Sequence, residues 1–265
     1  MKRPYIENPP TPWDWGKQLL DANEADPPYD MLVSARNANV LDVDAQKRWM
    51  LGFWLFYHVG VASWLTEQPD FWKAAFIVAR KEPEAVCTNG EWPRGGYRRY
   101  FRGKGAIDAL GIISGMGKAE DLVDWFYDGG MTFEEVFKRV KQLPTYGYTM
   151  SFKIADMGER VLGRPIIFRK EMDLPEEPEK GLLIAADYFK IPTEEVRDRI
   201  IAALDGCRLP GLSGRQPNIQ ETETVLCEWK HLLSGKFAIG RDGPKLRSHL
   251  APFGDLARAM SLHLP

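Results

Sequence analysis

The chain has 265 residues, of which 44% are hydrophobic, and carries a formal net charge of -2 at pH 7 with a pI near 6.1. This length allows one large domain or two small ones with a sizeable buried core. The charge excludes a surface coated in positive charge, so any nucleic acid must be bound by a local basic patch.

Three cysteines, Cys87, Cys207 and Cys227, are too few and too scattered for a disulfide framework or a four-ligand zinc site. No secretory signal is recognisable, so these residues are expected to be reduced cytosolic thiols. The sequence therefore predicts no metal centre.

The first forty residues are rich in Pro and Asp, with one short helical piece around residues 17–22. We expect residues 1–40 to form an extended segment on the surface of a helical domain that comprises residues 41–265. Asp42 or Asp44 is expected to cap a long helix that continues through Leu65. This helix contains the apolar run "WMLGFWLFYHVGVASWL", which is slightly short for a membrane span and is expected to be buried in the core.

Helical patterns dominate the remainder of the chain, and Thr132 with Glu135 predicts a capping box for one of these helices. The expected helices cover about 69–80, 104–114, 119–127, 133–143, 149–162, 179–189, 193–204, 219–233 and 245–262. Only "RPIIF" at 164–168 is strand-like, and it is too short to found a sheet. The predicted fold is all-α, with a possible boundary between two lobes in the acidic, Pro-bearing segment 171–180.

Positive charge concentrates in "EWPRGGYRRYFRGKG", residues 91–105. The basic residues are Arg94, Arg98, Arg99, Arg102 and Lys104. Guanidinium groups and exposed glycine amides suit phosphate oxygens, which favours an anion site. A solvated basic loop whose arginines pair with nearby carboxylates is the other interpretation.

The stretch "LPTYGYT", residues 143–149, joins two helical patterns and resembles the helix-hairpin-helix element of DNA glycosylases, whose hairpin reads Leu-Pro-Gly-x-Gly. Leu143, Pro144 and Gly147 match, whereas Thr145 replaces the first glycine. Such a hairpin turns backbone amides towards a DNA phosphate. The candidate DNA-binding residues are Tyr146, Gly147, Tyr148 and Thr149 of this stretch, with Lys104 of the basic stretch as a further one. A plain turn between two helices is the alternative.

Glycosidic-bond cleavage is poorly supported by the residues after this hairpin. Lyase-type glycosylases have a catalytic lysine where this chain has Thr149. The glycosylase aspartate would fall near 164–173, where only Glu171 and Asp173 are available and neither aligns cleanly. A glycosylase using Asp173 and a non-catalytic DNA-binding protein nevertheless remain as alternative functions.

Lys153 and Asp156 lie three residues apart on the helix that follows, so they share a face, either as an exposed ion pair or as part of a site. The surrounding "FKIADMGERVLG", together with "PRGGYRRYFRG", "FYHVGVASW" and "ETETVLCEWK", resembles the α-glutamyl/putrescinyl thymine pyrophosphorylase family of bacteriophages, also described as amino acid:DNA transferases. The resemblance extends over about residues 35–245.

The resemblance implies a helix-hairpin-helix glycosylase-like bundle of two lobes, in an enzyme active in the cytoplasm of an infected bacterial host. It also implies an activity on double-stranded DNA that contains pyrophosphorylated 5-hydroxymethyluracil. An amine, from an amino acid or a polyamine, would replace the pyrophosphate and give a hypermodified thymine. No cofactor beyond this amine is implied, and the identity of the amine and the need for a divalent ion stay open.

For the site, this chemistry implies that the guanidinium groups of Arg98, Arg99 and Arg102 bind the pyrophosphate. Asp156 or Glu223 would accept the proton of the amine, and Lys153 would assist the leaving group or hold a phosphate of the target strand. Tyr57 or His58 would flank a flipped-out base, although a packed core histidine is the other reading of His58. The turn at 235–243 is expected to bring Lys236 and Arg241 near DNA. Cys227 is expected to be a packed, inert thiol.

Overall fold

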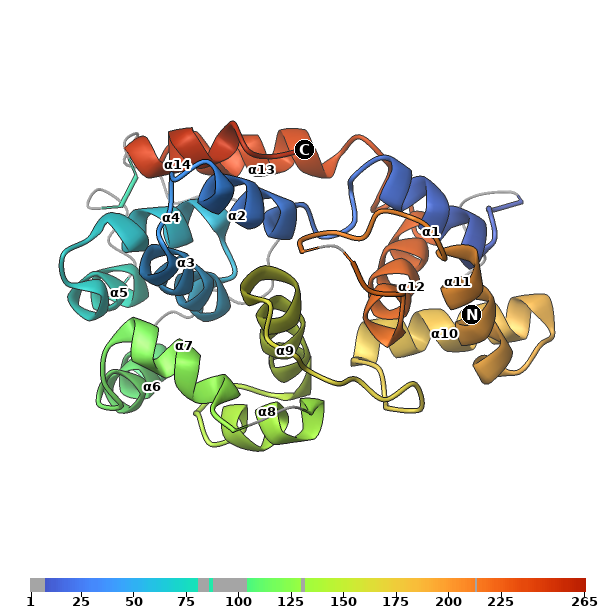
Figure 1. Ribbon diagram of the computed structural model, residues 1–265, viewed down its shortest axis with the longest axis horizontal. Helices are drawn as coiled ribbons and strands as arrows, with labels where there is room; N and C mark the ends of the chain where they lie inside the picture. Colours follow the sequence, from blue (N-terminus) through green and yellow to red (C-terminus); the bar gives the residue numbers. More distant parts are fainter. Residues whose placement is uncertain (1–7, 81–85, 88–103, 130–131, 213) are drawn as a thin grey trace.

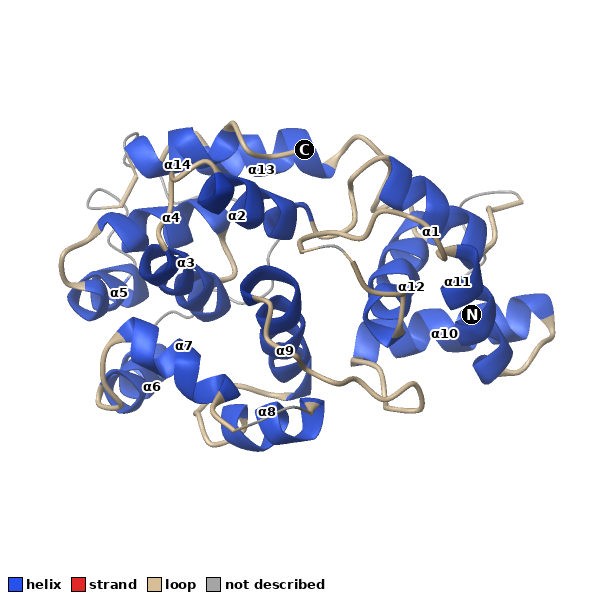
Figure 2. Ribbon diagram, in the orientation of Figure 1, coloured by secondary structure: helices blue, strands red, loops and turns tan. Residues whose placement is uncertain are grey.

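The computed structural model describes residues 8–80, 86–87, 104–129, 132–212 and 214–265, and this part of the chain consists of helices joined by loops and turns (Figure 2). The helices are α1 (Pro12–Asp21), α2 (Pro27–Asn37), α3 (Val43–Phe56), α4 (Val59–Glu67), α5 (Phe71–Arg80), α6 (Lys104–Ser114), α7 (Ala119–Tyr127), α8 (Phe133–Val140), α9 (Tyr148–Leu162), α10 (Glu176–Phe189), α11 (Thr193–Ala203), α12 (Ile219–Leu233), α13 (Asp242–Leu250) and α14 (Asp255–Ser261). The strand-like segment at 164–168 contributes a single bridge, between Ile167 and Thr132. The all-α prediction is confirmed.

The prediction of an extended surface segment over residues 1–40 is wrong, because α1 and α2 lie there and both enter the core. Trp15 of α1 and Tyr29 of α2 are buried. Each helix begins with proline at its first positions, where the missing N–H is not needed and the fixed φ favours a helix. The prolines therefore start these helices, whereas the sequence analysis expected the Pro-rich segment to be extended.

The single long helix expected up to Leu65 is two helices, α3 and α4, that pack against each other. Asp42 caps α3 as predicted, accepting the Ala45 N–H at 2.7 Å. Tyr57 then adopts a left-handed backbone with φ of 50°, and His58 starts α4 by accepting the Val61 N–H on Nδ1 at 3.2 Å. The break lies inside an uninterrupted apolar run, so hydrophobic periodicity could not reveal it.

The last predicted helix, 245–262, is likewise divided into α13 and α14. The other expected helices agree closely with those observed, and the Thr132–Glu135 capping box is present at the start of α8. Residues 141–147 form the turn between α8 and α9, in which Thr145 has φ of 73° and Gly147 is the N-cap of α9.

The helices form two groups beside a central α9 (Figure 1). In one group α1, α10, α11 and α12 pack together, and in the other α2 to α7 pack with α13 and α14. α9 contacts α2, α3 and α8. The division into two lobes near 171–180 stays a prediction, and so does the likeness to a glycosylase bundle.

Candidate active site

A cavity of about 560 Å³ lies where α9, α12, the start of α10 and the start of α13 approach one another. Its lining includes Tyr57 from the break between α3 and α4, and Thr149 and Lys153 from α9. A smaller cavity of about 110 Å³ shares Tyr57 and Lys153 with it and extends towards the start of α2. Together they form a continuous hollow that residues from both helix groups line.

The ammonium of Lys153 is fixed at the edge of the cavity by Asp26. Its Nζ lies 2.9 Å from Asp26 Oδ1, 3.8 Å from Asp156 Oδ2 and 5.0 Å from the centre of the Tyr29 ring. Burial alone would lower the pKa of Lys153, but Asp26, Tyr29, Tyr57 and Asp156 together outweigh burial and raise this pKa well above its usual value. Lys153 therefore presents a permanent positive charge.

Asp26 is a site residue that the sequence analysis missed. It occupies the N-cap position of α2 with φ of 49° and ψ of 55°, yet its side chain caps nothing. Instead, Oδ1 accepts from Lys153 and Oδ2 accepts from the Thr224 hydroxyl at 2.8 Å. Burial tends to raise the pKa of Asp26, but Lys153 and Arg160 bring it below its usual value. A left-handed non-glycine residue costs roughly 1–3 kcal/mol and is typical of functional sites.

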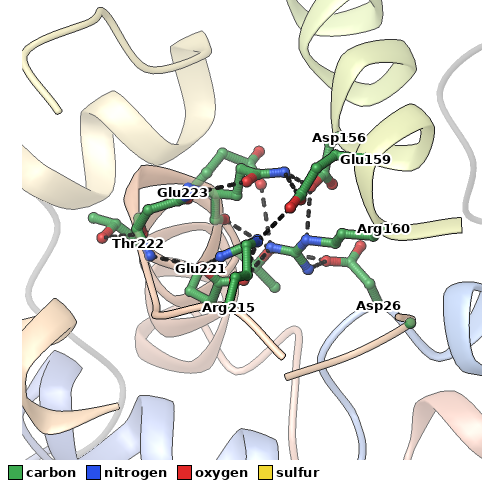
Figure 3. A network of polar contacts seen from close by, with 12 residues as sticks. Asp26, Asp156, Glu159, Arg160, Arg215, Glu221, Thr222 and Glu223 are labelled. Carbon is green, nitrogen blue, oxygen red and sulfur yellow. Dashed lines mark hydrogen bonds and ion pairs between the residues drawn. The ribbon is translucent and has the colours of Figure 1, made fainter. Parts of the chain in front are cut away.

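Asp156 lines neither cavity and belongs to a buried polar network (Figure 3). It is 1% exposed and accepts hydrogen bonds from the Tyr29 hydroxyl at 2.5 Å and from Gln220 Nε2 at 2.8 Å. Its Oδ1 also lies 2.9 Å from Arg160 Nε. The lone pairs of this carboxylate are thus committed to partners behind the cavity wall.

Arg160 is the centre of this network. Its guanidinium lies 2.6 Å from Glu221 Oε1 and 3.8 Å from Asp26 Oδ2, and Arg215 adds a second cation 2.9 Å from Glu221. Burial tends to raise the pKa of Glu221, but Arg160 and Arg215 lower it overall. The network joins α9, α12 and the start of α2, which are walls of the two cavities (Figure 3).

Glu223 lines the larger cavity from α12, two residues beyond Glu221, and is linked to the network through the Thr224 hydroxyl. Burial raises the pKa of its carboxyl group to about 8, with Asp26 adding to the shift and Lys153 opposing it. The Thr224 hydroxyl donates to Glu223 Oε2 at 3.4 Å. Glu223 therefore exchanges its proton near neutral pH, beside the fixed charge of Lys153.

Cys227 lies one turn further along α12 and lines the same cavity. Burial and the nearby Glu223 raise the pKa of its thiol, so it is protonated at neutral pH and is a poor nucleophile. The donor atoms of Cys227, Glu228 and His231 lie within 4.8 Å of one another, a spacing that three ligands of a divalent ion could adopt. Glu228 and His231 already face each other at 3.7 Å. The expectation of no metal site stays a prediction.

The other predicted site residues lie in varied surroundings. His58 is fully buried against His249 and Phe253 and lines neither cavity. Lys104 is an exposed residue at the start of α6. Arg98, Arg99 and Arg102 fall outside the described residues.

The predicted DNA-binding turn adjoins the cavity through Thr149. Tyr146 is buried, and Gly147 has open space where a Cβ would stand. The Tyr148 hydroxyl donates to the Asp173 carbonyl at 2.5 Å. Asp173, the alternative glycosylase residue, is exposed and lines neither cavity.

The helical fold places the fixed ammonium of Lys153 and the carboxyl group of Glu223, with its pKa of about 8, on one cavity. Such a site is typical of enzymes that transfer protons and stabilise anions. The chain belongs to the amino acid:DNA transferase family, because the sequence profile of that family matches residues 21–236. The family resemblance read from the sequence is therefore confirmed.

Two bacteriophage proteins are similar to nearly the whole chain. A glycinyltransferase of Pseudomonas phage PaMx11 is 29% identical over 272 residues, covering 92% of this chain and 91% of the relative. A putrescinyltransferase of Delftia phage PhiW-14 is 27% identical over 286 residues, covering 100% of this chain and 86% of the relative. The chain is accordingly an enzyme, a transferase that modifies DNA. Within its described residues, no helix combines the length and apolar character needed to span a membrane.

Proposed function

We propose that the enzyme replaces the pyrophosphate of pyrophosphorylated 5-hydroxymethyluracil in double-stranded DNA with an amine, in the infected bacterial host. The bond between the exocyclic methylene carbon and the pyrophosphate oxygen breaks, a carbon–nitrogen bond forms, and the amine nitrogen loses a proton. Family membership and the two transferase relatives support amine transfer to DNA. The observation that carries the proposal is that Lys153 and Glu223 line the same cavity.

Glu223 is the proposed proton acceptor. An amine is mostly an ammonium ion at neutral pH and must lose a proton to attack, and a base works best when its pKa is close to the working pH. The pKa of Glu223, about 8, meets this requirement. Asp156 was the other candidate, but its carboxylate is bonded to Arg160, Tyr29 and Gln220, so we assign it a positioning role.

Lys153 is the proposed stabiliser of the leaving group. Its ammonium is fixed in advance by Asp26, so little reorganisation is needed when negative charge develops on the departing pyrophosphate. Arg98, Arg99 and Arg102 are proposed to bind the same pyrophosphate.

The larger cavity is the proposed site of the flipped-out base. Its volume of about 560 Å³ suits a small ligand, and a stacked base must leave the duplex to be reached. Tyr57 offers an aromatic face at the wall, whereas the proposed role of the buried His58 is to start α4 and so present Tyr57. The turn with Tyr146, Gly147, Tyr148 and Thr149 is proposed to hold a phosphate of the duplex, with Lys104 as a further DNA contact.

Digestion of treated DNA and mass spectrometry of its nucleosides would test the proposal. Pyrophosphorylated DNA incubated with a panel of amines should yield intact amine-substituted nucleosides. Abasic sites would instead indicate a glycosylase, and unchanged DNA that the protein still binds would indicate a non-catalytic protein. Glu223→Gln should abolish most product, whereas Glu176→Gln, at an exposed carboxylate of the cavity rim, should not.

A further inference from the structure

Thr224 is a buried residue of α12 that lines both cavities and is 8% exposed. Its Oγ1 lies 2.8 Å from Asp26 Oδ2 and 3.4 Å from Glu223 Oε2. Asp26 in turn holds the Lys153 ammonium through its other oxygen. The Thr224 hydroxyl therefore lies between the ion pair that carries the fixed positive charge and the proposed base.

This hydroxyl is drawn away from the bond that a helical threonine often makes. A threonine inside a helix can donate its hydroxyl hydrogen to the carbonyl four residues earlier. Thr66 and Thr222 do so, at 2.8 Å and 3.2 Å. For Thr224 the corresponding distance, to the Gln220 carbonyl, is 3.4 Å, and the bond to Asp26 is shorter. The hydroxyl thus bonds most closely across the site, from α12 to the start of α2.

The single hydrogen of this hydroxyl has two carboxyl groups as acceptors. Thr224 can donate to Asp26 or to Glu223, but not to both at once. An ionised carboxylate is a stronger acceptor than a protonated carboxyl group. While Glu223 holds its proton, Asp26 is the stronger acceptor, in agreement with the two distances. Once Glu223 ionises, the two carboxylates compete, and Asp26 gives up the hydrogen more readily because Lys153 continues to neutralise it.

We infer that Thr224 is a positioning residue whose hydroxyl turns from Asp26 to Glu223 when Glu223 ionises, and back when Glu223 takes the proton of the amine. The hydrogen stays on Thr224 Oγ1 throughout, so no covalent bond changes in this step. The bond from Thr224 holds the ionised carboxylate at the cavity wall at the stage at which it accepts the proton. This inference rests on the proposed role of Glu223 as the base and adds the residue that orients it.

Removal of the hydroxyl leaves the other influences on Glu223 in place. The charged and titratable groups that act on it come from several elements and are Asp26 at the start of α2, Tyr57 between α3 and α4, Lys153, Asp156 and Arg160 on α9, and Cys227 on α12. Thr224→Val removes none of these groups and keeps the shape of the side chain. A hydrogen bond to the charged form of an acid lowers its pKa, so loss of the hydroxyl should raise the pKa of Glu223.

Titration of the Glu223 side chain by ¹³C NMR on glutamate-labelled protein, with the signal assigned by Glu223→Gln, measures this effect without DNA. Glu223 should titrate about one pH unit higher in Thr224→Val than in the wild type. Thr224→Ser keeps the hydroxyl and should titrate as the wild type does. Thr222→Val is the matched control, because Thr222 lies on the same helix, is fully buried and lines neither cavity.

Transfer to pyrophosphorylated DNA should follow the same order. Thr224→Val should slow it about tenfold near pH 7, and the loss should shrink above about pH 9, where Glu223 is ionised in both proteins. Thr224→Ser and Thr222→Val should stay near the wild-type rate. Thr224→Ala removes the same hydroxyl and should shift the titration in the same direction, so the comparison does not depend on how well valine packs.

The outcomes separate the inference from the proposed function. An unchanged titration of Glu223 in Thr224→Val, or a fall of its pKa, overturns the inference while amine transfer stands. A Thr224→Ser variant that behaves as Thr224→Val does also overturns it, because the hydroxyl would then not be the cause. Absence of product with every amine in the wild type refutes the proposed function, whereas the titration of Glu223 still decides whether the hydroxyl binds its ionised form.

Discussion

Glu223→Gln should change the pH dependence of stability in a way that needs no substrate. The folded protein holds the Glu223 proton up to about pH 8, whereas the unfolded chain releases it near 4.5. Between these values the folded state binds more protons, so the wild type loses stability as pH rises, by at most about 1.4 kcal/mol per pH unit. Glutamine cannot ionise and escapes this loss. Because Glu223 partly faces the cavity, where solvent screens it, we expect about half of that slope.

Urea unfolding of both proteins between about pH 6 and pH 9 measures the effect. The free energy of unfolding of the variant, minus that of the wild type, should increase by roughly 1–2 kcal/mol from about pH 6 to pH 8 and level off above. Other titrating groups are common to both proteins and cancel in the difference. Glu176→Gln, at the exposed rim, should give a flat difference. A flat or falling difference for Glu223→Gln would show that its carboxyl group titrates normally, and the assignment of this residue as the base would lose its support.

Wild-type transfer should rise about tenfold per pH unit below the Glu223 pKa of about 8 and level off above it; a pH-independent rate would exclude this base. Lys153→Met should slow transfer about 100-fold or more with little change in duplex binding, and equal losses of both would make Lys153 a DNA clamp. Asp156→Asn should lower the free energy of unfolding by about 3 kcal/mol, because Arg160 loses a buried counter-ion, and wild-type stability in urea would contradict the network. Thr145→Gly should raise the free energy of unfolding by about 1 kcal/mol, because glycine adopts the left-handed backbone with φ of 73° without strain. Unchanged stability of this variant would refute the prediction.

The helix boundaries were predictable wherever a capping residue and a periodic apolar face coincided, as at Asp42 and Thr132. The break between α3 and α4 at Tyr57 was not predictable, because both flanking helices are apolar and histidine is an uncommon N-cap residue. The core position of α1 and α2 was missed for a similar reason, since proline begins a helix or interrupts one according to its place.

The site was predictable only in part. Lys153 and Glu223 were chosen for their chemistry, and the fold brings both to one cavity. Asp26 is 127 residues from its partner Lys153 in the sequence, and no local pattern marks a contact over that separation. The commitment of Asp156 to Arg160 was also hidden, because helical spacing gives a shared face without saying which partner binds more tightly.

The buried charges explain how such distant residues keep their geometry. A buried ion pair often contributes little net stability compared with apolar side chains of the same volume, whereas removal of one partner is costly. Arg160 contacts Glu221 of α12 and lies near Asp26 at the start of α2, while its own helix, α9, carries Lys153. Any sliding of α9 against α12 would separate these charges in a medium of low dielectric. The network therefore restricts the two helices to one register, and in that register Lys153 and Glu223 line the same cavity.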